Sequence, residues 1–157
     1  MAIALSRIDE RLVHGQVAYS WSVAYEVDTL IVVDDLCAKD ALQKTLINMA
    51  IPRGKKGFVL SVKEAIEYFK EGKDIHQKIF LVAKSPEIYL RMVEGGVPLK
   101  EINVGGMYFR EGKKRLTRTV YVDKKDVEVF HKLKQFNVNC EIRTSPKDKS
   151  LNLYNLC

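Results

Sequence analysis

The residues best suited to chemistry lie in the stretch 6–21, which reads SRIDERLVHGQVAYSW. Its histidine, His14, directly precedes Gly15, Gln16 and Val17, where a segment of helical spacing begins. The free N–H groups and positive dipole end of that predicted helix would lie beside the imidazole and attract an anion. A neutral imidazole facing an anion site is suited to attack on phosphorus. The pattern is therefore compatible with a histidine that carries a phosphoryl group, the alternative being an ordinary polar loop residue.

Charged side chains precede this histidine in the same stretch. Arg11 is expected to engage the phosphoryl oxygens, and Arg7 to act as a supporting cation. Asp9 either orients Arg11 or accepts a hydrogen bond from the imidazole nitrogen that does not react. The alternative for these three residues is a solvated or salt-bridged strand end. Backbone donors and a helix terminus contribute only ~0.3–2 kcal/mol to the binding of an anion, and the sequence predicts neither a metal nor another cofactor.

Strands and helices that alternate along the chain must position these residues. Short apolar or β-branched runs predict strands at 1–6, 29–33, 57–60, 78–83, 101–104, 116–122 and 138–142. Helical spacing and end signals predict helices from about residue 15 and at 38–50, 61–72, 85–95 and 123–136. We therefore expect an α/β fold: an open, mostly parallel, twisted sheet of about seven strands with helices on both faces, and the active loop after the first strand. The strand at 138–142 alternates like a half-exposed edge strand, and residues 146–157 show no clear period.

Two other pairs are candidates for the same site. Asp34 and Asp35 end the second predicted strand, where either could form a salt bridge with an arginine of the first loop, or Asp35 could cap the next helix. Gly105 and Gly106 follow the fifth predicted strand and form either part of a phosphate-binding loop or a plain tight turn.

Composition narrows the class of protein. A chain of 157 residues with 46% hydrophobic content is long enough for one core, so we expect a single domain over residues 1–157. No apolar run approaches the ~18 residues that span a bilayer, which predicts a soluble, cytoplasmic protein. The cysteines are odd in number and far apart, which predicts reduced thiols rather than disulfides or a zinc site; they are Cys37, Cys140 and Cys157.

Basic residues suggest an anionic partner only weakly, because 26 Lys and Arg against 20 Asp and Glu, a net charge of +6, are spread along the chain. The densest cluster, which we call the basic cluster, is a solvated loop, a nucleic-acid patch or a docking rim for a protein; it consists of Arg110, Lys113, Lys114, Arg115 and Arg118. One alternative function is thus a basic α/β nucleic-acid-binding module without catalysis, although it lacks the usual motifs. A nucleotide-binding protein would need an unusual phosphate loop, because GxGxxG and GxxxxGK[ST] are both missing.

The run RIDERLVHGQVAYSW resembles the signature of the IIB components of the mannose/fructose/sorbose family of the bacterial phosphotransferase system. The similarity continues in the family's order through LIVVDD with a following Ala-Lys-Asp, LSVKEAI, INVGGMYFREGKK and VDKKDVEVFHKL, and so covers nearly the whole chain. The resemblance implies a protein-histidine phosphotransferase in which His14 receives a phosphoryl group from the histidine of a IIA domain. It further implies transfer to a sugar that enters through the membrane partners IIC and IID and leaves as the 6-phosphate.

The same resemblance implies an open α/β sheet with the active loop at the end of the first strand, where the pattern also places it. It does not identify the sugar, because mannose, fructose, sorbose and amino-sugar systems share these motifs. The other histidines, His76 and His131, have no glycine or arginine neighbours like those of His14, so we expect no catalytic role for them.

Overall fold

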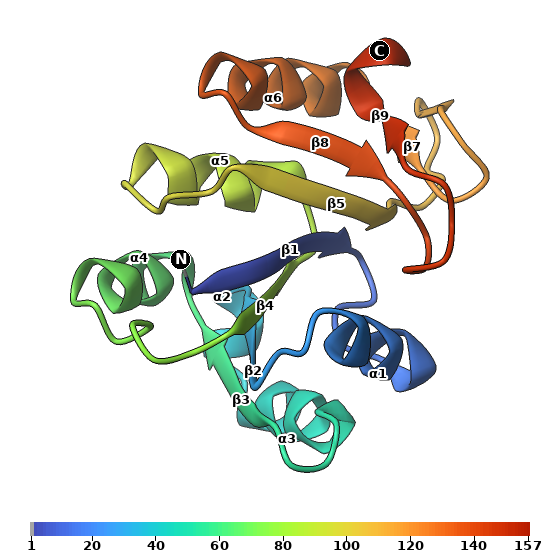
Figure 1. Cartoon of the computed structure of the whole chain (residues 1–157). Helices are drawn as coiled ribbons and strands as arrows, with labels where there is room; N and C mark the ends of the chain where they lie inside the picture. The colour runs from blue at the N-terminus through green and yellow to red at the C-terminus, as the bar shows by residue number, and fades with distance from the viewer. Residues whose placement is uncertain (1) are drawn as a thin grey trace.

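The computed structural model describes residues 2–157 and contains a twisted seven-stranded sheet with the order β3-β2-β4-β1-β5-β8-β9 (Figure 1). All neighbouring strands pair in parallel except β9, which is antiparallel to β8. The predicted fold class is therefore confirmed. The strands are β1 (Ile3–Asp9), β2 (Thr29–Val33), β3 (Lys56–Leu60), β4 (Ile79–Ala83), β5 (Glu101–Gly106), β8 (Asn139–Ile142) and β9 (Leu151–Asn152).

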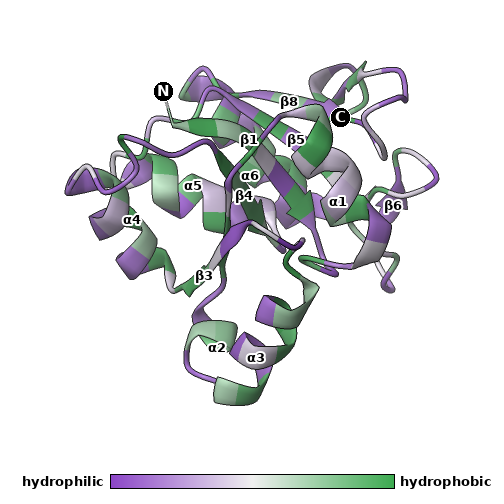
Figure 2. Cartoon of the chain, turned by 60° about the horizontal axis from the view of Figure 1, so that its bottom comes forward, coloured by the Kyte–Doolittle hydropathy of each residue, from purple (hydrophilic) through white to green (hydrophobic). Residues whose placement is uncertain are grey.

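Helices cover both faces of this sheet, as predicted. One face packs against α4, α5 and α6 in a core that includes Tyr89 and Phe130, and the other against α1, α2 and α3 in a core that includes Trp21 and Ile47. Figure 2 shows hydrophobic residues concentrated along the central strands. No helix within residues 2–157 is long and apolar enough to cross a membrane. The helices are α1 (Gly15–Ala24), α2 (Asp35–Ala38), α3 (Ala41–Ala50), α4 (Val62–Lys70), α5 (Pro86–Glu94) and α6 (Lys124–Gln135).

The segment predicted as one helix at 38–50 is instead two helices, α2 and α3. Asp40 breaks it, because its carboxylate accepts hydrogen bonds from the backbone N–H groups of Leu42 and Gln43 and so caps a new helix. The apolar face of α3 is turned outward, since Leu42, Leu46 and Met49 are all exposed. The buried contact of this helix is made by Ile47.

Two predicted strands also differ from the structure. Within the segment 116–122, only the end forms a strand, β7 (Tyr121–Val122), which pairs with β6 (Lys114–Arg115) in an antiparallel hairpin outside the main sheet. The N–H groups of Leu116 and Thr117 bond the Val120 carbonyl and close that turn. β8 is an inner strand rather than an edge, because the C-terminal segment supplies β9 and a 3-10 helix (Leu153–Asn155) beside it.

The order of the strands determines where a ligand site can form. The chain leaves β1 toward α1 on one face, whereas it leaves the neighbouring β4 toward α5 on the other face. In open α/β sheets, ligands bind beyond the carboxyl ends of strands at such a switch point. The loop between β1 and α1, which was predicted to carry the site, lies at this position (Figure 1).

Candidate active site

The first strand continues past Ser6 to Asp9, so Arg7 and Asp9 lie inside β1 and not in the loop where we expected them. Met1, which the predicted strand included, lies outside the described residues. The strand is longer because β1 is paired on both sides: Arg7 lies opposite Val82 of β4 and Asn103 of β5. Arg7 is 2% exposed and Asp9 is 0% exposed. Charges buried to this degree require partners, and each has them.

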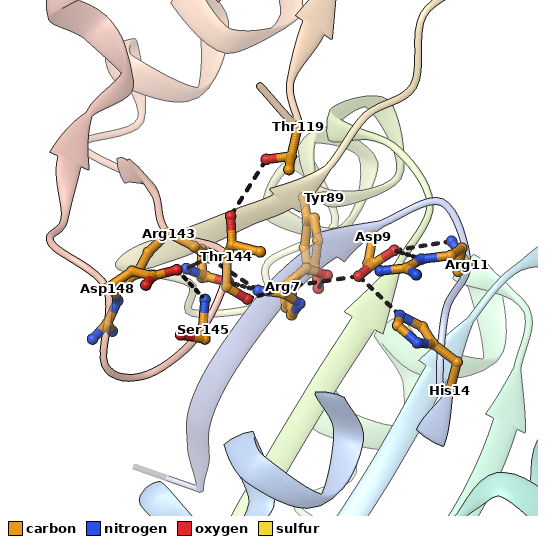
Figure 3. Close-up of polar contacts among 11 residues, drawn as sticks. Arg7, Asp9, Arg11, His14, Tyr89, Thr119, Arg143, Thr144, Ser145 and Asp148 are labelled. Carbon is orange, nitrogen blue, oxygen red and sulfur yellow. Dashed lines mark hydrogen bonds and ion pairs between the residues drawn. The ribbon is translucent and has the colours of Figure 1, made fainter. Parts of the chain in front are cut away.

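Asp9 is the centre of the site (Figure 3). Its Oδ1 accepts a hydrogen bond from the backbone N–H of Arg11 at 3.0 Å and lies 3.6 Å from the Arg11 Nε. Its Oδ2 accepts from Arg7 Nη2 at 3.3 Å and lies 3.4 Å from Nε2 of His14. Both roles considered for Asp9 are therefore combined in one carboxylate, which orients Arg11 with one oxygen and holds the imidazole with the other.

Arg7 is clamped behind Asp9 and turned away from solvent. Its Nη1 donates to Asn103 Oδ1 at 2.5 Å and to the backbone carbonyl of Arg143 at 3.2 Å, while Nη2 donates to the carbonyl of Thr144 at 3.2 Å. Burial lowers the pKa of the Arg7 guanidinium from its ordinary value, and the Asp9 carboxylate opposes that shift. Arg7 thus supports Asp9 and has almost no surface with which to contact an external anion.

Gly105 and Gly106 make room for these two side chains. A Cβ at Gly105 would lie 2.1 Å from Arg7 Cζ, and one at Gly106 would lie 3.1 Å from Asp9 Oδ1. These glycines end β5 next to β1. Glycine is required there because the buried ion pair of Arg7 and Asp9 lies against the β5 backbone.

His14 is the N-cap residue of α1, and its side chain makes no capping hydrogen bond. The imidazole is 25% exposed, with Nε2 toward Asp9. Gly15 begins the helix at a φ of +41°, a backbone conformation that favours glycine. The first turn, Gly15, Gln16 and Val17, carries no acidic side chain, so its N–H groups are available to an anion beside the imidazole. Arg11, whose side chain is 53% exposed, lies on the open side of the site.

Asp34 and Asp35 form no salt bridge with Arg7 or Arg11, so that prediction is wrong. Asp34 caps α2 by accepting from the Cys37 N–H at 2.9 Å, the role we had considered for Asp35. Asp35 accepts from the Val62 N–H at 2.9 Å and from Arg91 Nη1 at 3.2 Å, and the first of these bonds chiefly lowers the pKa of the Asp35 carboxyl.

The basic cluster is partly used within the molecule. Arg110 Nη2 donates to Glu10 Oε1 at 2.6 Å, and the other oxygen of Glu10 accepts from the Tyr108 N–H at 2.5 Å. Lys113 forms an ion pair with Asp126 of α6 at 2.9 Å. Glu10 therefore ties the loop after β5 to the loop after β1. These partners reduce the free positive charge that a nucleic-acid patch would need.

Sequence reasoning missed several residues of the site. Asn103, Arg143 and Thr144 surround Arg7, and the buried hydroxyl of Tyr89 donates to the carbonyl of Arg7 at 2.8 Å. Of these residues, only Asn103 could have been found from the sequence, because it is a polar residue inside an otherwise apolar run. Among the described residues, no three His, Cys, Asp or Glu side chains gather closely enough to hold a metal ion. Cys37, Cys140 and Cys157 are not paired with one another.

The chain is similar to known proteins in both sequence and fold. Residues 3–157 match the family model for the PTS system sorbose subfamily IIB component. The N-acetylgalactosamine-specific phosphotransferase enzyme IIB component 1 of Escherichia coli K12 is 41% identical over 150 residues, covering 94% of this chain and 93% of that protein. The crystal structure of the IIBSor domain of the sorbose permease from Klebsiella pneumoniae superposes with a TM-score of 0.94 at 34% identity, covering 99% of this chain and 95% of that one.

The mannose-specific EIIAB component of Escherichia coli K12 is 40% identical over 156 residues, which are 98% of this chain and 48% of that protein. The chain thus spans about half the length of this relative. These matches do not support the alternative of a nucleic-acid-binding module. From the matched sequence and the matched fold, the chain belongs to the sorbose subfamily of IIB components of the phosphotransferase system for sugars.

Proposed function

We propose that residues 1–157 act as one IIB domain, a protein-histidine phosphotransferase that accepts a phosphoryl group on His14 from a IIA domain. The group then passes to a sugar that enters through IIC and IID membrane partners. The observation that carries the proposal is a partly exposed imidazole at the N-terminus of α1, held on one nitrogen by a fully buried carboxylate. The name of the EIIAB relative, half of which this chain spans, supports a IIA domain as the donor.

Nδ1 of His14 is the atom that attacks phosphorus in this proposal. When Nε2 carries its proton toward Asp9, the lone pair of the neutral imidazole is on Nδ1. The Nδ1–P bond forms as the P–N bond of the donor phosphohistidine breaks, and the electron pair of that bond returns to the donor imidazole. The proton stays on Nε2, and the Asp9 carboxylate stabilises the imidazolium character of the product.

The surroundings of His14 suit a group that is accepted and then released. The N–H groups of Gly15, Gln16 and Val17 and the exposed guanidinium of Arg11 would contact phosphoryl oxygens. Arg7 acts through Asp9 only. Because the donors are backbone groups and one exposed cation, the phosphoryl group is held without excess stabilisation, and every ~1.4 kcal/mol of such excess would shift the exchange equilibrium tenfold.

The proposal is tested by incubating the full chain with phosphoenolpyruvate, the general phosphotransferase proteins and a IIA domain. We expect an acid-labile, alkali-stable mass gain on the peptide that contains His14, and none on the peptides that contain His76 or His131. A label located on either of those peptides instead would overturn the assignment.

Replacing Arg11 by alanine should leave the fold intact and slow phosphoryl exchange roughly 10²-fold, because an oriented donor to the developing charge is lost. The side chain is 53% exposed, so the free energy of unfolding should change by no more than about 0.5 kcal/mol. Rapid-quench kinetics and chemical denaturation measure the two effects. Arg53→Ala, an exposed arginine before β3, is the control. Wild-type exchange in Arg11→Ala would remove Arg11 from the mechanism.

Replacing Gly105 by alanine should displace the Arg7 guanidinium and lower the exchange rate by about 10²-fold, since the new methyl group would occupy the position of Arg7 Cζ. Overpacking of this kind destabilises by about 1–3 kcal/mol. Gly95→Ala is a matched control, because its Cβ would lie 2.5 Å from an atom of Ile66, away from the site. The free energy of unfolding should fall in both variants, whereas the exchange rate should fall only in Gly105→Ala. Equal exchange rates in the two variants would show that the displacement of Arg7 does not affect transfer.

A further inference from the structure

Arg143 follows β8 and lies behind the arginine that supports Asp9 (Figure 3). Its backbone carbonyl accepts one hydrogen bond from Arg7 Nη1 and another from Asn103 Nδ2, each at 3.2 Å. The next carbonyl, that of Thr144, accepts from Arg7 Nη2. The loop after β8 therefore supplies two of the four oxygen acceptors around the Arg7 guanidinium.

The side chain of Arg143 ties this loop to the rest of the molecule. Its Nη1 donates to the carbonyl of Pro146 at 3.2 Å, which closes the loop on itself. Its Nη2 donates to Glu141 Oε1 at 3.0 Å and to the hydroxyl oxygen of Tyr25 at 2.6 Å. Glu141 is buried and also accepts from Asn103 Nδ2 at 3.3 Å. One guanidinium thus joins the loop, the sheet and the C-terminal end of α1.

Trp21 provides a second link to α1. This residue is fully buried, and the Cζ atoms of Arg7 and Arg143 each lie 5.0 Å from its ring centroid. Contacts of two guanidiniums with one indole restrict its position. Because α1 carries His14 at its N-terminus, the contacts at Trp21 and Tyr25 also determine where the imidazole lies.

These contacts form a row of four ionisable side chains of alternating sign: Asp9, Arg7, Glu141 and Arg143. The amide of Asn103 links its two ion pairs, since Oδ1 accepts from Arg7 and Nδ2 donates to Glu141. Burying such a row is not the most stable solution, since apolar residues of similar volume are often equally or more stabilising. Phosphoryl transfer, in contrast, depends on an imidazole held in place, and a displacement of about 1 Å can slow a reaction 10²-fold. The need to position the His14 imidazole therefore explains these buried charges better than a contribution to stability does.

We propose that Arg143 is a positioning residue for phosphoryl transfer at His14. It holds the Arg7 guanidinium toward Asp9 and fixes α1 through Tyr25 and Trp21, and it thereby maintains the contact of His14 Nε2 with Asp9. Arg143 itself does not touch the phosphoryl group. The expected effect on the transfer rate rests on the proposed function. The expected effect on the position of the imidazole rests only on the geometry of the unphosphorylated protein.

The test compares Arg143→Met and Arg143→Lys in the full chain. With a phosphorylated IIA domain as donor, Arg143→Met should lower the maximal transfer rate on the order of 10²-fold and leave KM for the donor within about twofold. In ¹⁵N NMR of the unphosphorylated protein, the population of His14 with its proton on Nε2 should fall. Arg143→Lys should be intermediate, because an ammonium keeps the charge but cannot reach all three acceptors. Arg91→Met, which removes an arginine from an exposed ion pair with Asp35, should change neither readout.

An unchanged rate and tautomer in a folded Arg143→Met, with only a lower unfolding temperature, would show a merely structural role and overturn the proposal. If that variant does not fold, Tyr25→Phe removes only the 2.6 Å hydrogen bond, and Tyr68→Phe, which loses a 2.5 Å bond to Gln77, is its control. A lower transfer rate in Tyr25→Phe but not in Tyr68→Phe supports the positioning role of Arg143. Equal transfer rates in the two variants contradict it. Should the wild-type protein not be phosphorylated on His14, the proposed function fails, while the NMR comparison still decides whether Arg143 positions the imidazole.

Discussion

Replacing His14 by alanine is expected to abolish phosphorylation of the protein, a loss of at least about 10³-fold in transfer, while the fold is retained. Among the side chains that contact Asp9, only His14 offers a nucleophile, because the other two, Arg7 and Arg11, are cations. The lost side chain is partly exposed and makes one 3.4 Å contact, so the free energy of unfolding should change by no more than about 1 kcal/mol.

The measurement is the stable incorporation of phosphate from phosphoenolpyruvate, together with thermal unfolding. His131→Ala, which removes an exposed histidine of α6, is the matched control and should be phosphorylated like the wild type. Retention of an acid-labile label in His14→Ala would mean that the phosphoryl group is carried elsewhere.

Replacing Arg7 by methionine should have the largest effect on stability, a loss of about 3–5 kcal/mol, and should also stop efficient transfer. Methionine leaves the fully buried Asp9 without its buried cation and leaves Asn103 Oδ1 and the carbonyls of Arg143 and Thr144 without their donor. With Asp9 free to move, the imidazole loses its orientation. Arg7→Lys should recover only part of both losses, since an ammonium cannot match four acceptors spread over a plane.

A double substitution separates stability from catalysis at this site. Arg7→Met combined with Asp9→Leu removes both buried charges and should recover most of the lost free energy of unfolding, because paired charges replaced together are often neutral in cost. Transfer should stay as low as in Arg7→Met, because no carboxylate orients His14. Chemical denaturation and rapid-quench kinetics give the two quantities. Recovery of transfer in the double variant would show that Asp9 and Arg7 serve the fold alone.

The sequence alone predicted the elements whose signals are local. The helix starting at Gly15, the helix predicted from residue 61 and the buried runs of β2 and β4 depend on residues a few positions apart, and the structure has all of them. The α/β class followed from their alternation. His14 was recognisable for the same reason, because its glycine, its arginines and its helix lie within one short stretch.

Other features became apparent only in the tertiary structure, because they depend on residues far apart in sequence. From the sequence, Arg7 and Asp9 were predicted to lie in a loop. In the structure they lie in β1 between β4 and β5, where Asn103 and the loop after β8 supply partners for Arg7. Gly105 was predicted to lie in a phosphate loop or a turn. In the structure, the Arg7 guanidinium occupies the space that a side chain at position 105 would need. The sequence by itself thus determined the fold class and singled out His14 as the candidate, and the tertiary structure decided which distant groups hold that histidine in place.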